Sequence, residues 1–155
     1  MFKCFFVLVN LFCLTSLALA DAEDRDVSLV VRMIKASGVM EKNRDHHSAP
    51  EIDARLDDIK INLEQLPYRK FSFISTIEVP VAMRKRKTIR LLGANVLDVR
   101  LLYIDKDKTG MWVQWSDKEG SEVLDSRLHF YSGESVVVGT DATDDAAYIL
   151  ALGIK

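Results

Sequence analysis

Cysteine is scarce in this sequence: its two cysteines, Cys4 and Cys13, both lie within the first twenty residues. Those residues are expected to be removed, so the mature chain is predicted to have no disulfide, no thiol nucleophile and no thiolate metal site. Proline and glycine are also sparse, with three and seven residues among 155. A small domain without covalent links depends on its hydrophobic core, and residues 21–155 are enough for one domain of ordinary size.

An excess of positive charge is also lacking. The sequence has 21 basic and 23 acidic side chains, for a formal net charge of −2. Loss of Lys3 with the leader makes the mature chain slightly more acidic. This balance gives no overall attraction to nucleic acid or anionic lipid, so no nucleic-acid partner is expected.

The first twenty residues have the organisation of a secretory signal peptide. Lys3 precedes an apolar run over residues 5–14, and the small residues Ala18 and Ala20 fit an A-x-A cleavage site. The run is short for a membrane span, which needs roughly 20 apolar residues, although an uncleaved anchor is the alternative. We therefore expect a signal peptide at 1–20, a secreted or periplasmic location, and a mature chain without a transmembrane segment.

One amphipathic helix is predicted at about 49–66. Ser48 is the expected N-cap, with Pro50 in the first turn and Glu51 completing a capping box. Pro67 is expected to end the helix. Five apolar residues recur with helical spacing and predict one stripe packed against a flat partner: Ile52, Leu56, Ile59, Leu63 and Leu66.

The rest of the mature chain is predicted to be β-rich. A first strand is expected at 27–36, and short β-rich runs separated by turn residues follow the helix. The predicted fold class is α+β, mostly β: a single antiparallel sheet or sandwich-like domain at 21–155 with one helix near its N-terminus. The later strands are expected at 69–79, 87–92, 95–104, 111–116, 122–131, 134–139 and 146–153.

Two segments have partial metal-site character. Asp45 with His46 and His47 offers common ligands, but adjacent histidines on a loop define no coordination geometry. Residues 105–110, Asp-Lys-Asp-Lys-Thr-Gly, match the first half of a calcium loop, whereas position twelve is Ser116 instead of glutamate. A solvated loop and a hairpin turn are the favoured interpretations, and no metal ligand or cofactor is assigned.

The densest charge run is 84–87, Arg-Lys-Arg-Lys, followed by Arg90. It suggests either a solvated hairpin tip, which is favoured, or a site for phosphate or lipid headgroups. Single-stranded nucleic acid would need stacking aromatics nearby, and this run has none in the sequence. The acidic pair Asp144 and Asp145 is also interpreted as solvated.

No catalytic motif is present, and no catalytic residue is assigned. His129 suggests either a base paired with Asp125 or Ser126, or a histidine on the solvent face of a strand, which is favoured. Four aromatic residues suggest either a ligand platform or, as favoured, sheet core and cross-strand pairs: Tyr103, Trp112, Trp115 and Tyr131.

Two stretches carry a resemblance. Residues 63–75, LEQLPYRKFSFIS, and residues 132–139, SGESVVVG, followed by AYILAL at 147–152, resemble small secreted bacterial proteins in which a helix precedes a β-rich domain. The C-terminal part is also similar to the last strands of secretin-type channels, although Thr140 replaces the expected second glycine. The resemblance implies a secreted location and a β-rich fold with one helix. It implies no activity and no site residues.

We therefore expect a non-enzymatic protein of the bacterial envelope, with a role in protein interaction and possible relation to secretion or surface appendages. Its partner is expected to be another envelope or secreted protein, and its oligomeric state is open. Residues 148–154 are the candidate edge strand for strand addition, unless they form an inner strand. The alternatives are a small envelope hydrolase or ligand-binding enzyme with a site formed only in three dimensions, and a calcium-dependent module at Asp105 and Asp107.

Overall fold

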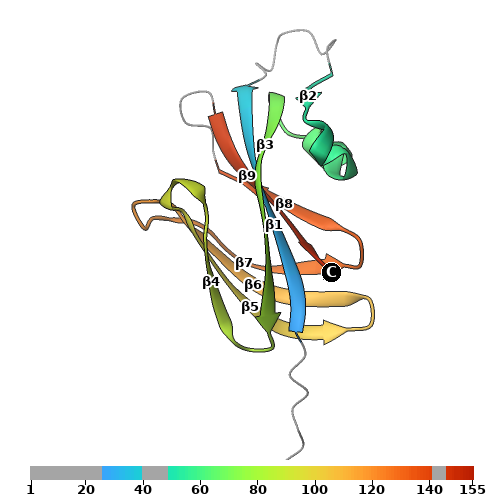
Figure 1. Ribbon diagram of the computed structural model, residues 1–155, viewed down its shortest axis with the longest axis vertical. Coiled ribbons are helices and arrows are strands. Elements are labelled where there is room, and N and C mark those ends of the chain that lie inside the picture. Colours follow the sequence, from blue (N-terminus) through green and yellow to red (C-terminus); the bar gives the residue numbers. More distant parts are fainter. Residues whose placement is uncertain (1–25, 40–48, 141–145) are drawn as a thin grey trace, which may run out of the picture.

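The computed structural model describes residues 26–39, 49–140 and 146–155, and the predicted signal peptide lies outside them. These residues form two β-sheets, one short helical segment and a separate 3₁₀ turn, η2 (Leu92–Ala94), with their connecting loops (Figure 1). The mostly β, α+β prediction is confirmed. A single sheet is wrong, because the chain crosses between two sheets at the β3–β4 and β7–β8 turns.

The five-stranded sheet, here sheet A, has the order β2-β3-β1-β9-β8, and the four-stranded sheet B has the order β4-β5-β6-β7. All neighbours pair antiparallel except β2 and β3, which pair parallel. Sheet A contains β1 (Asp26–Val39), β2 (Glu51–Ile52), β3 (Tyr68–Ala82), β8 (Ser135–Gly139) and β9 (Ala146–Ile154). Sheet B contains β4 (Arg86–Arg90), β5 (Val96–Asp105), β6 (Lys108–Ser116) and β7 (Glu122–Tyr131).

All eight predicted strands are present, and their bounds differ from the prediction by a few residues at most. The turns that separate them are where the turn residues indicated. Gly120 and Gly133 have φ angles of 82° and 78°, a conformation that glycine adopts without steric cost. Local sequence therefore determines where each strand begins and ends.

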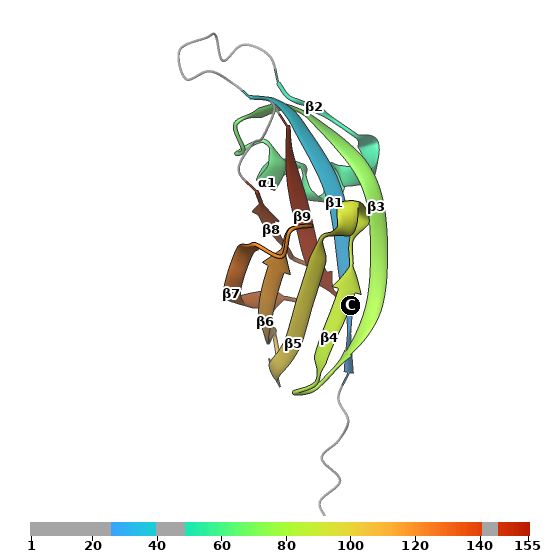
Figure 2. The ribbon, with the colours of Figure 1, turned by 90° about the vertical axis from the view of Figure 1, so that its left-hand side faces the viewer.

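The long strand β1 contributes side chains to two hydrophobic cores, one on each face of sheet A. Leu29, Val31 and Met33 point into the core shared with sheet B. Ile34 and Ala36 point to the opposite face, where the helical segment packs. Figure 2 shows sheet B against one part of sheet A and the helical segment beside the other part. Each half of β1 is thus buried on a different side.

A β-bulge in β3 lets this strand follow the same division. Met33 pairs with Ser75 and Ile34 pairs with Phe73, so Ile74 is an extra residue. One extra residue reverses the side on which later side chains point. Phe73 therefore packs with the helical segment, whereas Ile77, two positions beyond the pairing shift, packs towards sheet B.

The helical segment is shorter than predicted. It consists of η1, a 3₁₀ helix at Ala54–Ile59, and α1 at Lys60–Leu63. Residues 51–52 form β2 instead of a first helical turn, and Ser48 lies outside the described residues. The predicted apolar stripe is confirmed, because all five of its residues contribute to the core between the helical segment and sheet A.

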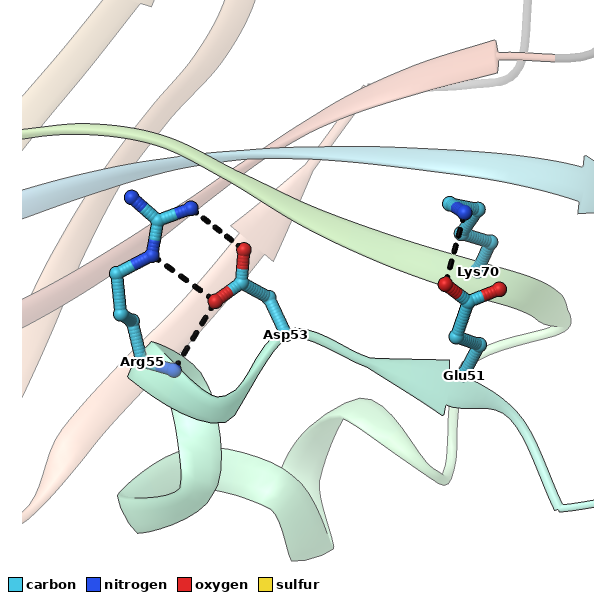
Figure 3. A network of polar contacts seen from close by, with 4 residues as sticks. All are labelled: Glu51, Asp53, Arg55 and Lys70. Atoms are coloured by element: carbon cyan, nitrogen blue, oxygen red, sulfur yellow. Dashed lines mark hydrogen bonds and ion pairs between the residues drawn. The ribbon is translucent and has the colours of Figure 1, made fainter.

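Two polar contacts explain the later helix start (Figure 3). Asp53 is the N-cap: its carboxylate accepts from the Arg55 main-chain N–H at 3.1 Å and from the Arg55 guanidinium at 2.6 and 2.9 Å. Before it, Glu51 pairs with Lys70 of β3 at 2.8 Å. The Asp53 N–H donates to the Phe71 carbonyl, so strand pairing takes the residues that the capping box would have used.

Candidate binding surfaces

The outer face of sheet B brings together several of the side chains that the sequence singled out, with others that it did not. One row across its four strands consists of Arg86, Arg100, Trp112 and Arg127, and we call it the arginine row. The next row consists of Tyr103, Gly110 and His129, the tyrosine row. The main-chain register of three strand pairs therefore assembles six polar or aromatic side chains from distant parts of the sequence on one surface.

Trp112 is the centre of the arginine row. Its ring centroid lies 5.6 Å from Cζ of Arg86 and 5.7 Å from Cζ of Arg100, within the range of cation–π attraction. Its indole N–H donates to Asp125 at 2.7 Å. The basic run thus has an aromatic neighbour in space, and the sequence-based argument that it has none is wrong, because Trp112 is distant in the chain.

The three arginines differ in their carboxylate partners. Arg86 pairs with Asp98 at 2.6 Å, and this hydrogen bond lowers the pKa of Asp98, to which Thr88 also donates. Within residues 26–39, 49–140 and 146–155, Arg100 and Arg127 form no ion pair. Both are exposed, so two guanidinium groups in this row are available to an external anion.

In the tyrosine row, the Tyr103 ring lies flat on Gly110. A Cβ atom added to Gly110 would overlap Cε1 of Tyr103 and would be almost equally far from Cζ and Cδ1, at 2.6 and 2.7 Å. If the added Cβ instead lay in the plane of the ring, beyond its edge, its distances to Cζ and Cδ1 would be much longer. Gly110 is therefore covered by one face of the ring, and Tyr103 remains 38% exposed.

The alternative interpretation, His129 as a base paired with Asp125 or Ser126, is not supported by the contacts. The His129 ring lies 6.1 Å from the Tyr103 ring, and the hydrogen bonds of Asp125 come from Trp112 and Gln114. His129 is exposed on the strand, in agreement with the favoured interpretation.

The four aromatic residues proposed as a platform divide between the two faces of sheet B. Trp115 is fully buried in the core, where its N–H donates to Asn95 at 3.2 Å. Trp112 and Tyr103 lie on the outer face, and Tyr131 is 46% exposed beyond His129 on β7. The core interpretation thus holds for Trp115, and the ligand platform stays a prediction.

The segment 105–110 is a hairpin turn. Lys106 and Asp107 connect β5 to β6, and Asp105 accepts from the Lys106 N–H at 2.8 Å. Gly110 lies inside β6. Among the residues that the structure describes, no three His, Cys, Asp or Glu side chains are grouped to hold a metal ion. Residues 45–47 and the pair Asp144 and Asp145 lie outside the described ranges.

The predicted edge strand at 148–154 is an inner strand, because β9 pairs with β1 on one side and β8 on the other. The edge of sheet A on this side is β8. Its three valines, Val136, Val137 and Val138, are only partly buried.

Two hollows are open to solvent. The larger, about 890 Å³, lies between the β5, β6 and β8 ends and is lined by polar groups that include Asp117, Glu119 and Glu122. The smaller, about 260 Å³, contains Arg32 paired with Asp58 at 2.6 Å. No histidine lines either hollow, and Asp117 accepts from main-chain N–H groups of its own turn. Neither hollow contains a histidine–carboxylate pair, and the enzyme alternative stays a prediction.

Comparisons with protein families, curated proteins and solved structures give no match to this chain. In the segments that the structure describes, no helix is both long and apolar enough to cross a membrane. The resemblance to secreted bacterial proteins and to secretin strands therefore stays a prediction.

Sequence reasoning did not identify Arg100, Arg127 or Gly110 as parts of a surface. Single arginines in strands are ordinary, and Gly110 follows a turn. Their significance depends on strand register, which pairs residues that are distant in the chain.

Proposed function

We propose that this protein is a non-enzymatic interaction protein of the bacterial envelope, secreted or periplasmic, that binds a protein partner by strand addition at β8. The observation that carries this proposal is the unprotected edge of sheet A. Three consecutive valines lie there, and β8 contains no charge, no proline and no bulge. An edge of this kind offers main-chain hydrogen bonds and side-chain contacts to an extended segment of another protein.

The other long edges have features that discourage strand addition. β3 has the bulge at Ile74, and Pro80 has no N–H to donate. The Ser28 carbonyl accepts from the Lys155 N–H, so Pro80, opposite Ser28, directs its main-chain groups away from β1. β4 and β7 carry exposed charges along their length, which disfavour apolar strand pairing.

Hydrogen bonds at the end of β8 define which main-chain groups face outward. The Thr140 N–H donates to the Tyr148 carbonyl at 2.9 Å, so Thr140 faces β9. The main-chain N–H and C=O groups of successive residues point to opposite sides of a strand. Those of Val136 and Val138 therefore also point towards β9, whereas those of Val137 point outward. A partner strand would bond to Val137 and its alternate neighbours.

The location is proposed from the sequence. The leader at 1–20 has the features of a secretory signal peptide, and the β8–β9 pair is the part that is similar to the last strands of secretin-type channels. A protein exported to the envelope with an open apolar edge fits a role in assembly or secretion.

The experiment is affinity capture of the tagged mature protein from the envelope and culture fluid of its own host, with mass spectrometry. Val137→Pro removes an outward N–H without removing a bond to β9. Arg90→Pro is the matched control: Leu91 N–H donates to Asn95, so the alternating Arg90 N–H points away from β5 at the β4 edge. Circular dichroism and thermal melting verify that both variants fold.

We expect a specific envelope protein to be recovered by the natural chain and by Arg90→Pro, and to be lost with Val137→Pro. Recovery by all three proteins would contradict binding at β8. If folded bait captures no envelope protein, the interaction role itself is contradicted.

A further inference from the structure

The tyrosine row and the arginine row form one continuous surface, which is separate from the hydrophobic core and from the β8 edge. Tyr103 provides a flat, partly exposed ring, and Arg100 and Arg127 provide guanidinium groups without carboxylate partners among the described residues. Rows of side chains on one face of a strand are about 6.8 Å apart, and neighbouring strands about 4.8 Å. The row that carries the ring and the row that carries the guanidinium groups are thus separated by about the size of one small cyclic molecule.

We propose that this surface binds a hexuronic acid residue of an acidic polysaccharide. The sugar ring lies on the exposed face of Tyr103, and its carboxylate accepts hydrogen bonds from Arg100 and Arg127. A planar guanidinium matches a carboxylate with two parallel hydrogen bonds. The aromatic face supplies the apolar contact that a pyranose ring makes through its C–H groups.

Two structural features prepare the site before a ligand arrives. The absence of a side chain at Gly110 allows the Tyr103 ring to lie flat, because any larger residue would occupy the position of the ring. The Trp112 ring, fixed by its hydrogen bond to Asp125, lies near Arg100 and restricts the motion of that side chain. Side chains that are already ordered lose less conformational entropy on binding.

Charge on the neighbouring row favours a single anionic sugar over a nucleic acid. Asp98 and Asp125 lie directly beside the arginine row, so negative charge borders its positive charge on that side. Single-stranded nucleic acid requires a positive groove that follows several phosphates. An acidic peptide would pair with the arginines but would gain nothing from the flat ring.

The test measures binding of polygalacturonate by the full mature protein, with affinity electrophoresis and the fluorescence of the half-buried Trp112. The ligand control is the methyl ester of the same polymer, which has the same rings without charge. Oligothymidylate and polyglutamate are the other polyanions tested.

We expect polygalacturonate to bind and the methyl ester to bind at least about tenfold more weakly, since a charge-assisted hydrogen bond of 1.5–3 kcal/mol corresponds to about tenfold or more. Tyr103→Ala, Arg100→Gln and Arg127→Gln should each weaken binding by a similar factor. Arg90→Gln, on the same sheet two rows away, should change it less than twofold.

Equal binding of the ester, tighter binding of oligothymidylate or polyglutamate, or unchanged binding by the folded Tyr103→Ala and Arg100→Gln variants would overturn the proposal. So would the absence of polygalacturonate binding. Val137→Pro should leave sugar binding unchanged, so failure at this surface and failure of strand addition at β8 are distinguishable.

Discussion

At the scale of single residues, Gly110 shows how little a residue type says without its neighbours. In the sequence it ends a turn-like segment, Asp105 to Gly110. In the structure it lies within β6, has no positive φ angle, and is required because the Tyr103 ring occupies the position of a side chain. Its role is to provide space, not backbone freedom.

A double-mutant cycle tests this role. Gly110→Ala should lower the free energy of unfolding by about 1–3 kcal/mol, the usual cost of overpacking, because the Tyr103 ring must move. In a Tyr103→Ala background the same substitution should cost about 0.5 kcal/mol or less, since the obstructing ring is absent. Urea unfolding of the four proteins measures both values. An equal cost in the two backgrounds would show that the ring is not what excludes a side chain at Gly110.

At the scale of elements, the helical segment depends on its contact with sheet A. The 3₁₀ helix and α1 together contain only ten residues, too few for a stable isolated helix. Leu56, Ile59 and Leu63 are buried against β1, β3 and β9, whereas Ile61 is 75% exposed. Tertiary packing therefore stabilises this segment.

Leu56→Ala should lower the free energy of unfolding by about 2–5 kcal/mol, because it leaves a cavity between the helical segment and sheet A. Ile61→Ala, a change of the same kind on the exposed side, should change it by about 0.5 kcal/mol or less. Chemical denaturation measures both variants. Similar losses for the two would contradict the assigned buried face.

An ion pair also connects this segment to sheet A and predicts a pH dependence. Arg32 of β1 donates to both carboxylate oxygens of Asp58 at 2.6 and 2.7 Å, and these bonds lower the pKa of Asp58. A carboxyl group with a lower pKa in the folded state stabilises the fold above its unfolded pKa. That stabilisation is lost as the pH falls below about 4, the ordinary value for aspartate.

Asp58→Asn should therefore be less stable than the natural protein at pH 7, and the difference should diminish as the pH falls from about 4 to below 3. Unfolding curves across this range provide the measurement. Asp57→Asn removes the same charge one residue earlier, where the described residues include no ion pair, and should show no such convergence. A constant difference between Asp58→Asn and the natural protein at all pH values would contradict the contribution of this pair.

At the scale of the whole molecule, β1, β3 and β9 belong to both hydrophobic cores. Leu150 and Leu152 of β9 face sheet B, while Ala147, Ile149 and Ala151 face the helical segment. Neither core can form unless these central strands are paired. The two cores are therefore expected to fold as one cooperative unit.

Unfolding of a Trp112→Phe variant tests this cooperativity, because the remaining Trp115 is buried between the sheets. Its fluorescence and the far-ultraviolet circular dichroism should change at the same urea concentration. Adding Leu63→Ala, which damages only the core at the helical segment, should shift both transitions together. Two separate transitions would show that the cores unfold independently.

The β-rich class, eight strand positions, their turns and the apolar stripe of the helical segment could be predicted from the sequence. These follow from local properties: side-chain alternation, β-branched residues, and glycine at turns. For the same reason, Val137 and its neighbours could be recognised as strand residues, but not as an edge.

How these elements combine could not be predicted from the sequence. The apolar residues on both sides of the bulge at Ile74 have odd numbers, Phe71 and Phe73 before it and Ile77, Val79 and Val81 after it, yet the bulge divides them between two cores. Pairing of residues 51–52 with β3 displaced the predicted capping box, and strand register brought Tyr103 over Gly110 and Trp112 beside Arg100. Strand order, bulges and register depend on pairing between residues distant in the chain, and local periodicity contains no information about that pairing.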